Sequence, residues 1–336
     1  MGEVSGIAWT DATFNPWWGC ERVSPGCDNC YAEAWAKRTG HVAGGARLPV
    51  WGSSEARKEM SASYWRGPFK WNADAEKAGK RRRVFCASMA DVFELVPESN
   101  VQATAVMREA RARLWYAISA TPWLDWLLLT KRPQNVKRLA PLEWLEDGFP
   151  ANVWLGTTAE DAVRAEQRIP HLLALPAAVH FVSYEPALGP VSFAPWLPST
   201  GLRSRTTSDW KAANALDWII VGGESGPKAR PFALEWAERV VDETRGRAAC
   251  FVKQLGAHVV SEHRTAPLYM LEKEGKLPET LPPYCFAPDG SVWAWRAGLK
   301  DAKGGDPSEW PASLCVREFP EPKRIARPAF AKGAPR

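Results

Sequence analysis

The sequence has 336 residues, of which 46% are hydrophobic and 24% are charged. This balance excludes a mainly disordered, collagen-like or small disulfide-stapled chain and predicts a globular protein with a substantial core. The formal net charge of +5 permits contact with nucleic acid but does not require it. The sequence shows neither a signal-peptide pattern nor a run of about 18 apolar residues. We therefore expect a cytoplasmic protein with no membrane partner.

Seven short apolar runs, each ending in small or polar residues, predict the strands of a parallel sheet. They lie near Ala12–Asn15 and at Val84–Ser88, Trp126–Thr130, Asn152–Gly156, Val179–Tyr184, Trp218–Gly222 and Cys250–Gln254. Helical patterns alternate with them at Tyr31–Arg38, Asn100–Ala117, Thr158–Arg168 and Phe232–Arg245. An open doubly wound sheet would gather its polar groups at one switch point, whereas here they follow every strand. We therefore predict an α/β fold, a full or partial (β/α) TIM-like barrel.

Composition divides the chain into two parts. We assign residues 1–256 to the barrel domain, with an insert at about 47–83 that is rich in tryptophan, glycine and charge and ends in Lys80–Arg83. Leu197–Ala215 is polar and predicts a flexible surface loop. Residues 257–336 form a C-terminal extension with a small hairpin around Ser291–Trp295. The tail after Arg324 is expected to be mobile.

Three of the seven cysteines lie close together, at Cys20, Cys27 and Cys30. The loop follows the first predicted strand, which in a barrel places it at the face where chemistry occurs. Structural zinc would need a fourth protein ligand, and the nearest histidine, His41, lies eleven residues past Cys30. Three thiolates can hold an iron–sulfur cluster and leave one iron open. The pattern favours iron–sulfur, with zinc or no metal as the alternatives.

The loop resembles the three-cysteine motif of the radical S-adenosylmethionine (SAM) enzymes. Their common spacing is CxxxCxxC with an aromatic residue before the last cysteine; here the first spacer has six residues, Asn29 takes that place and Tyr31 follows. A longer resemblance, to a bacteriophage and prophage family with a radical-SAM-like three-Cys motif, covers roughly residues 7–256. It is carried by WWGC, VSPGCDNCYAE, VFCASMADVFE, LLTKRP, VWLGTTAED, FVSYEPALGP, WIIVGGESGPKARP and FVKQLG.

The resemblance implies a 4Fe–4S cluster on Cys20, Cys27 and Cys30, with SAM bound at the open iron. It also implies an electron donor such as flavodoxin or ferredoxin, and reductive cleavage of SAM to a 5′-deoxyadenosyl radical that abstracts hydrogen from a substrate. The polar groups of SAM need complementary partners, which the strand ends offer. The candidate SAM-binding residues are Tyr31, Ser88, Asp91, Lys131, Thr157, Thr158, Glu160, Glu185, Gly222, Gly223, Glu224, Ser225 and Lys253.

Some of these residues also have structural interpretations. Thr157, Thr158 and Ser225 could instead cap helices. The cations Lys131, Arg132, Lys228 and Arg230 could bind the SAM carboxylate or a substrate phosphate, or else pair with nearby glutamates.

The nineteen tryptophans bear on the substrate. Trp9, Trp17, Trp18 and Trp35 flank the cysteine loop and could shield a cluster, whereas Trp126, Trp154 and Trp218 belong to predicted strands and to the core. Stacking on bases is left to Trp51, Trp65 and Trp71 in the insert, which with Lys80–Arg83 favours nucleic acid as substrate. The alternative function is a non-catalytic phage protein that binds nucleic acid and contains zinc or a cluster.

Overall fold

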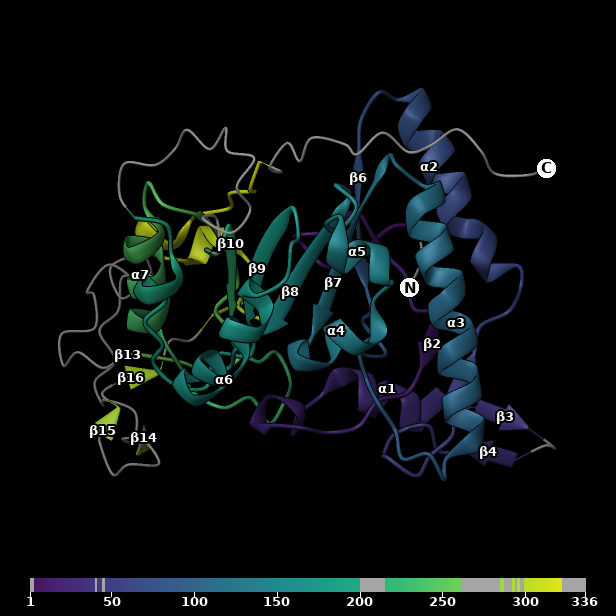
Figure 1. Cartoon of the computed structure of the whole chain (residues 1–336). Coiled ribbons are helices and arrows are strands. Elements are labelled where there is room, and N and C mark those ends of the chain that lie inside the picture. Colours follow the sequence, from purple (N-terminus) through teal and green to yellow (C-terminus); the bar gives the residue numbers. More distant parts are fainter. Residues whose placement is uncertain are drawn as a thin grey trace.

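Seven parallel strands form the centre of the structure and follow one another in chain order. The computed structural model describes residues 3–39, 41–43, 46–199, 215–261, 285–286, 292–293, 295–296 and 299–321. The strands are β1 (Ala12–Thr13), β6 (Arg82–Cys86), β7 (Leu124–Thr130), β8 (Val153–Thr158), β9 (Val179–Tyr184), β10 (Trp218–Gly222) and β12 (Ala249–Gln254). The sheet curls into a half-barrel, a partial TIM-like barrel (Figure 1). The predicted fold class is confirmed.

Helices cover the convex face of this sheet. They are α2 (Gly67–Lys77), α3 (Val101–Ala120), α4 (Val136–Leu139), α5 (Leu142–Glu146), α6 (Ala162–Leu173) and α7 (Leu234–Thr244). Helix α1 (Tyr31–Thr39) lies instead at the carboxyl ends of the strands (Figure 1), where Ala32 and Ala36 pack with Val50 and Met89. Alternate strand residues, such as Val84 and Leu128, join the apolar faces of α3, α6 and α7 in one large core. No helix in the described ranges is long and apolar enough to cross a membrane.

The concave face carries a second core made largely of aromatic rings. Phe85, Trp154, Phe181, Trp218 and Phe251 point inward from five strands, and Trp9 packs among them. Trp218 meets Trp154 and Phe251 edge to face, at 6.0 and 6.3 Å between ring centroids. These rings therefore fill the half-barrel on the side of the strands' amino ends.

The start of α6 differs from the prediction. Thr157 and Thr158 are the last residues of β8, and the helix begins at Ala162, after Asp161. The Asp161 side chain accepts a hydrogen bond from the Arg164 N–H at 2.8 Å, which makes it the N-cap. The alternative of helix capping is thus wrong for both threonines. It is also wrong for Ser225, which lies exposed between β10 and β11, well before α7.

Short strand pairs lie outside the main sheet. In the insert, β5 (Lys58–Glu59) pairs with β2 (Trp17–Trp18), and β4 (Ala46–Leu48) pairs with β3 (His41–Ala43). In the C-terminal part, β13 (Val259–Ser261) lies between β11 (Phe232–Ala233) and β16 (Trp295–Arg296). β14 (Cys285–Phe286) and β15 (Val292–Trp293) form an antiparallel pair near the predicted hairpin.

Residues 299–321 pack against the half-barrel. Trp310 and Leu314 are buried in the large core, and the Val252 N–H donates to the Val316 carbonyl at 2.9 Å. The predicted mobile tail after Arg324 lies outside the described residues, and so do residues 200–214 of the predicted flexible loop.

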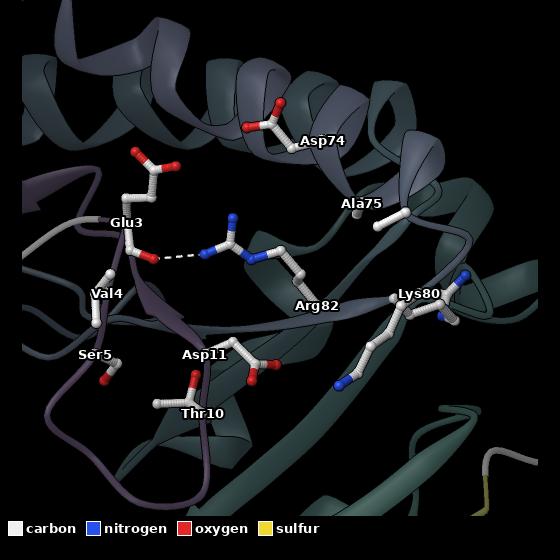
Figure 2. Close-up of a pocket in the computed structure, with 11 residues that line it drawn as sticks. Glu3, Val4, Ser5, Thr10, Asp11, Asp74, Ala75, Lys80 and Arg82 are labelled. Carbon is white, nitrogen blue, oxygen red and sulfur yellow. Dashed lines mark hydrogen bonds between the residues drawn. The ribbon is translucent and has the colours of Figure 1, made fainter.

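The basic run Lys80–Arg83 leads into β6 and therefore lies at the amino ends of the strands, opposite the cysteine loop. Arg81 pairs with Asp125 at 2.6 Å and Arg83 with Asp11 at 3.3 Å. A cavity of about 560 Å³ lies at this edge. Figure 2 shows Arg82 among its lining residues, donating to the Glu3 carbonyl. Groups of both signs line the cavity, so it lacks the uniform positive charge that phosphates favour.

The aromatic residues of the insert also correct the prediction. Trp65 and Trp71 are each only 5% exposed and belong to the large core, because η2 (Tyr64–Arg66) and α2 pack them against the sheet. Their rings are not available for stacking on bases. Trp51 is half-buried beside the cysteine loop.

Gly156 provides a test of the aromatic core. A Cβ atom at this position would lie 2.4 Å from the Phe181 ring. We predict that Gly156→Ala lowers the free energy of unfolding by about 1–3 kcal/mol, as overpacking does, measured by urea denaturation. Adding Phe181→Leu should recover part of the loss. Gly6→Ala is the matched control, because a Cβ there meets no atom within 4 Å. Equal stability of Gly156→Ala and wild type would contradict this packing.

Candidate functional site

The first cysteine of the loop is fixed by backbone contacts. Cys20 forms a β-bridge with Trp51, and its carbonyl accepts from the Gly52 N–H at 2.9 Å. Gly19 has φ +120°, and a Cβ there would lie 2.3 Å from the Val50 carbonyl oxygen. Glycine is therefore required for the insert to lie against Cys20.

The other two cysteines flank a tight turn. Cys27 ends the 3₁₀ helix η1 (Pro25–Cys27), its carbonyl accepts from the Cys30 N–H at 3.2 Å, and Cys30 directly precedes α1. Cys30 packs with Trp18 and Trp51 against a small apolar cluster, Ala32, Ala36, Val50 and Met89. Trp18 therefore lies beside Cys30, and its role in shielding a cluster stays a prediction. Trp9 and Trp17 lie instead in the two cores, and Trp35 is 39% exposed on α1.

Cations act on two of the thiols. The Arg132 Nη1 lies 3.7 Å from the Cys20 Sγ, and Lys131 acts electrostatically on Cys30. Burial raises the pKa of Cys30, while the Glu33 N–H and Lys131 oppose it. Burial also strongly raises the pKa of Cys20, Glu94 adds to this, and Arg132 opposes it. The cations thus favour the thiolate that a metal requires, and burial favours the thiol.

Thiolates are the ligands that soft metal ions and iron–sulfur clusters prefer. Within the described ranges, no three His, Cys, Asp or Glu side chains are grouped so that they could hold a metal ion. Cys20 instead faces Arg132. The assignment of the three cysteines as ligands stays a prediction.

Arg132 belongs to a buried group of four charges. Its Nη1 lies 3.0 Å from Asp91 Oδ2, and its Nη2 lies 3.6 Å from Glu94 Oε1. The other partner of Glu94 is Arg57, at 3.0 Å, and neither of these two side chains has any exposed surface. Arg57 also donates to the carbonyls of Gly52, Glu55 and Ala56. One connected network therefore joins the Cys20 side chain to the segment that covers it.

Polar side chains occupy the concave face at the carboxyl ends of the strands. By strand alternation Thr158, Ser183, Gly222 and Lys253 share the face of the aromatic core, which lies nearer the amino ends. Lys131 Nζ donates to Thr158 Oγ1 at 3.3 Å, and Lys253 Nζ lies 2.8 Å from Glu185 Oε1.

The Glu185–Lys253 pair reaches across the glycine of the strand that lies between them. A Cβ at Gly222 would lie 2.7 Å from Glu185 Oε1, so a side chain there would displace the carboxylate. Ser183 donates to the other oxygen, Oε2, at 3.3 Å. The structure thus brings together four predicted SAM-binding residues, Lys131, Thr158, Glu185 and Lys253, beside Gly222.

Two predicted glutamates bind the cysteine loop. Glu160 accepts from the Gly26 N–H at 3.3 Å and pairs with Arg168 at 2.8 Å. Although burial acts to raise it, the pKa of Glu160 lies below its ordinary value because of Arg168. Glu224 pairs with Arg230 at 2.6 Å and accepts from Asn29 Nδ2 at 3.0 Å.

Arg230 itself reaches the loop. Its Nη2 donates to the Pro25 carbonyl at 2.9 Å, and its Nη1 lies 3.2 Å from Asp28 Oδ2. For Arg230 the sequence alternative of ion pairing with glutamate is confirmed. We call the three residues Asn29, Glu224 and Arg230 the latch, because they join the cysteine loop to the segment after β10.

The remaining predicted residues have local roles. Thr157 Oγ1 donates to the Thr130 carbonyl at 2.9 Å, on the convex side of β8. The Tyr31 hydroxyl donates to the Ser88 carbonyl, and Ser88 in turn pairs with Asn15. Gly223 packs against the Leu255 carbonyl, where a Cβ would approach to 2.4 Å.

Sequence reasoning missed Arg57, Asn29 and Arg168. Arg57 lies in an irregular segment with no periodicity, and Arg168 looks like an ordinary residue of an amphipathic helix. The pair joins a residue just before α6 to one in its second turn, a contact that no sequence periodicity indicates.

The chain belongs to the family described as "Protein of unknown function (DUF5131)", whose model matches residues 4–295. No curated protein and no solved structure matches the chain significantly.

The latch makes a testable claim about the loop. We predict that Arg230→Ala raises the rate at which iodoacetamide alkylates Cys27 and Cys30 in the metal-free protein severalfold, measured by peptide mass spectrometry. The free energy of unfolding should change by about 1 kcal/mol or less, because the Arg230 side chain is 30% exposed. Arg245→Ala, which removes an exposed pair with Asp242, is the control and should leave alkylation unchanged. Identical rates in the two variants would show that the latch does not hold the loop.

Proposed function

We propose that this member of the family is a radical SAM enzyme, with an iron–sulfur cluster held by Cys20, Cys27 and Cys30. The supporting observation is that three cysteines lie in one loop at the carboxyl end of a curled parallel sheet, with Arg132 in contact with Cys20. Catalytic sites of β/α barrels are found at this end. When bound, the cluster and SAM supply one-electron cleavage chemistry that removes a hydrogen atom from a substrate.

The residues of the chain have separate tasks in this proposal. Trp18, Trp51 and the small apolar cluster exclude water from the Cys30 thiol. Arg132, Glu160 and the latch hold the loop at the strand ends. The polar row of Lys131, Thr158, Glu185 and Lys253 offers donors and acceptors of both charges, which the ammonium and carboxylate of SAM need.

No described contact supports the predictions of substrate and electron donor. The cations of Lys80–Arg83 lie at the opposite edge of the sheet and most of them are paired, so they give no support to nucleic acid as substrate. Flavodoxin or ferredoxin as the electron donor stays a prediction.

The first experiment is anaerobic reconstitution with iron and sulfide. We expect a brown protein with absorption near ~400 nm, and release of 5′-deoxyadenosine from SAM with dithionite. Cys20→Ala, Cys27→Ala and Cys30→Ala should each lose both signals, because three thiolates are needed to hold the cluster. Cys315→Ala removes an exposed cysteine away from the loop and should keep both. Stoichiometric zinc without iron uptake would refute the proposal and favour the alternative of a non-catalytic zinc protein.

The polar row is tested separately from the cluster. Lys253→Met should weaken SAM binding to the iron-loaded protein about tenfold or more, the value of one charge-assisted hydrogen bond, measured by calorimetry. Iron content should not change, since Lys253 contacts Glu185 and no cysteine. Lys70→Met is the control, because Lys70 is exposed on α2 and pairs with Glu3 and Asp74. Unchanged affinity in Lys253→Met would remove the row from the SAM site.

A further inference from the structure

We infer that the C-terminal segment 299–321 is a positioning element of the polar row. It holds Lys253 against Glu185 and so sets the affinity of the row for a ligand that carries both an ammonium and a carboxylate. We call this segment the strap, and it lies beyond residues 4–295, which the family model matches. The inference rests on the proposed function only where SAM is the ligand, because the Glu185–Lys253 pair is itself part of the structure.

Lys253 lies where the sheet holds its backbone least. Its strand, β12, is an edge strand of the described sheet and lies beside β10. The register between these two strands skips one residue, since Val221 is opposite Val252 and Gly222 is opposite Gln254. Lys253 is therefore left without a partner on β10, as in a β-bulge, where the strand bends and a side chain is re-aimed. The direction of this side chain depends on what holds β12 from its other side.

The strap holds β12 from that side, and its hydrogen bonds bracket Lys253. Directly before it, the Val252 N–H donates to the Val316 carbonyl at 2.9 Å. Two residues after it, the Leu255 N–H donates to the Gly304 carbonyl at 2.8 Å. Two separate parts of the strap thus fix the backbone on both sides of the bulge.

The turn that carries Gly304 is itself well fixed. Its residue Asp301 accepts hydrogen bonds from the Lys303 and Gly305 N–H groups through its carboxylate. The Gly304 carbonyl also accepts from the Trp310 indole N–H at 3.1 Å, and Trp310 is buried in the large core. The turn is therefore anchored to the half-barrel and presents a carbonyl at a defined place beside β12.

The contact between this turn and the end of β12 leaves no space for a side chain. A Cβ at Gly304 would lie 2.5 Å from the Gly256 carbonyl oxygen and 2.9 Å from the Gly256 nitrogen. Both are main-chain atoms, so a larger residue would push the turn away and break its bond to Leu255. The bulge would then be held on one side only. Since the Lys253 side chain is 25% exposed, burial alone does not keep its amine on Glu185.

The experiment measures the reactivity of the Lys253 amine in the full chain without metal, by acetylation with an N-hydroxysuccinimide ester and peptide mass spectrometry. We expect severalfold faster acetylation of Lys253 in Gly304→Ala than in wild type, because an amine that leaves its carboxylate is more accessible and more easily deprotonated. Lys131 belongs to the same row but bonds to Thr158, and its rate should not change. A general loosening of the fold would raise both rates.

Gly79→Ala is the matched control. Gly79 has φ +62°, close to the +60° of Gly304, but a Cβ there meets no atom within 4 Å. This variant therefore carries the backbone strain without the contact, and Lys253 should react as in wild type.

Two further variants cover the case in which Gly304→Ala does not fold. Asp301→Ala should speed acetylation of Lys253, whereas Asp301→Asn keeps one acceptor oxygen for the turn and should lie closer to wild type. Equal rates at Lys253 in wild type, Gly304→Ala and Asp301→Ala, or equal increases at Lys253 and Lys131, would overturn the inference and leave the proposed function intact.

A second measurement connects the strap to ligand binding. Calorimetry with SAM on the reconstituted protein should show severalfold weaker binding in Gly304→Ala. In the Lys253→Met background the same substitution should have no further effect, because the strap acts through that amine. Equal losses in both backgrounds would overturn the positioning role. A wild-type protein that does not bind SAM would refute the proposed role of the row, and the acetylation rates would then decide the inference by themselves.

Discussion

Charges that are buried must be paired, and this requirement organises the carboxyl end of the half-barrel. Arg57, Asp91, Glu94 and Arg132 have side chains with little or no exposed surface, and none could lie there alone without a cost of several kcal/mol. Their partners come from the insert, from the segment after β6 and from the end of β7. Once these segments are joined, the Cys20 backbone is enclosed between them. The position of the first cysteine is thus a consequence of the charge pairing.

The concave face shows a second consequence of the parallel sheet. Inward-facing positions pass from aromatic rings, such as Trp154 and Phe251, to polar groups two to four residues further along the same strands. The rings fill the half-barrel toward the amino ends of the strands, and polar side chains occupy the concave face only at the carboxyl ends. The one glycine between Glu185 and Lys253 allows these two side chains to meet across a strand. The polar row and the cysteine loop consequently lie at the same end of the sheet.

The sequence was sufficient for the strands but only partly for the site. Short apolar runs, buried on both faces, identify parallel strands without reference to partners, so all seven were predicted. Polar residues at the strand ends were also predicted, but which of them face the concave side and which the convex side was not. Thr157 and Thr158 are neighbours that point to opposite faces, and a strand boundary misjudged by a few residues hides this. Arg57 and Asn29 form contacts with residues distant in sequence, which no local pattern encodes.

The long first spacer of the cysteine motif has a physical explanation in these contacts. Three backbone groups between Cys20 and Cys27 are held by charged side chains, each from the end of a different strand. Arg132 after β7 binds the Glu21 carbonyl, Glu160 after β8 binds the Gly26 N–H, and Arg230 after β10 binds the Pro25 carbonyl. A spacer of three residues would offer fewer such groups. Because the contacts are to main-chain atoms, the loop depends less on its own side chains than on the barrel edge. The half-barrel therefore fixes the path of the loop from three directions, which is the rigidity that a site built on a loop otherwise lacks.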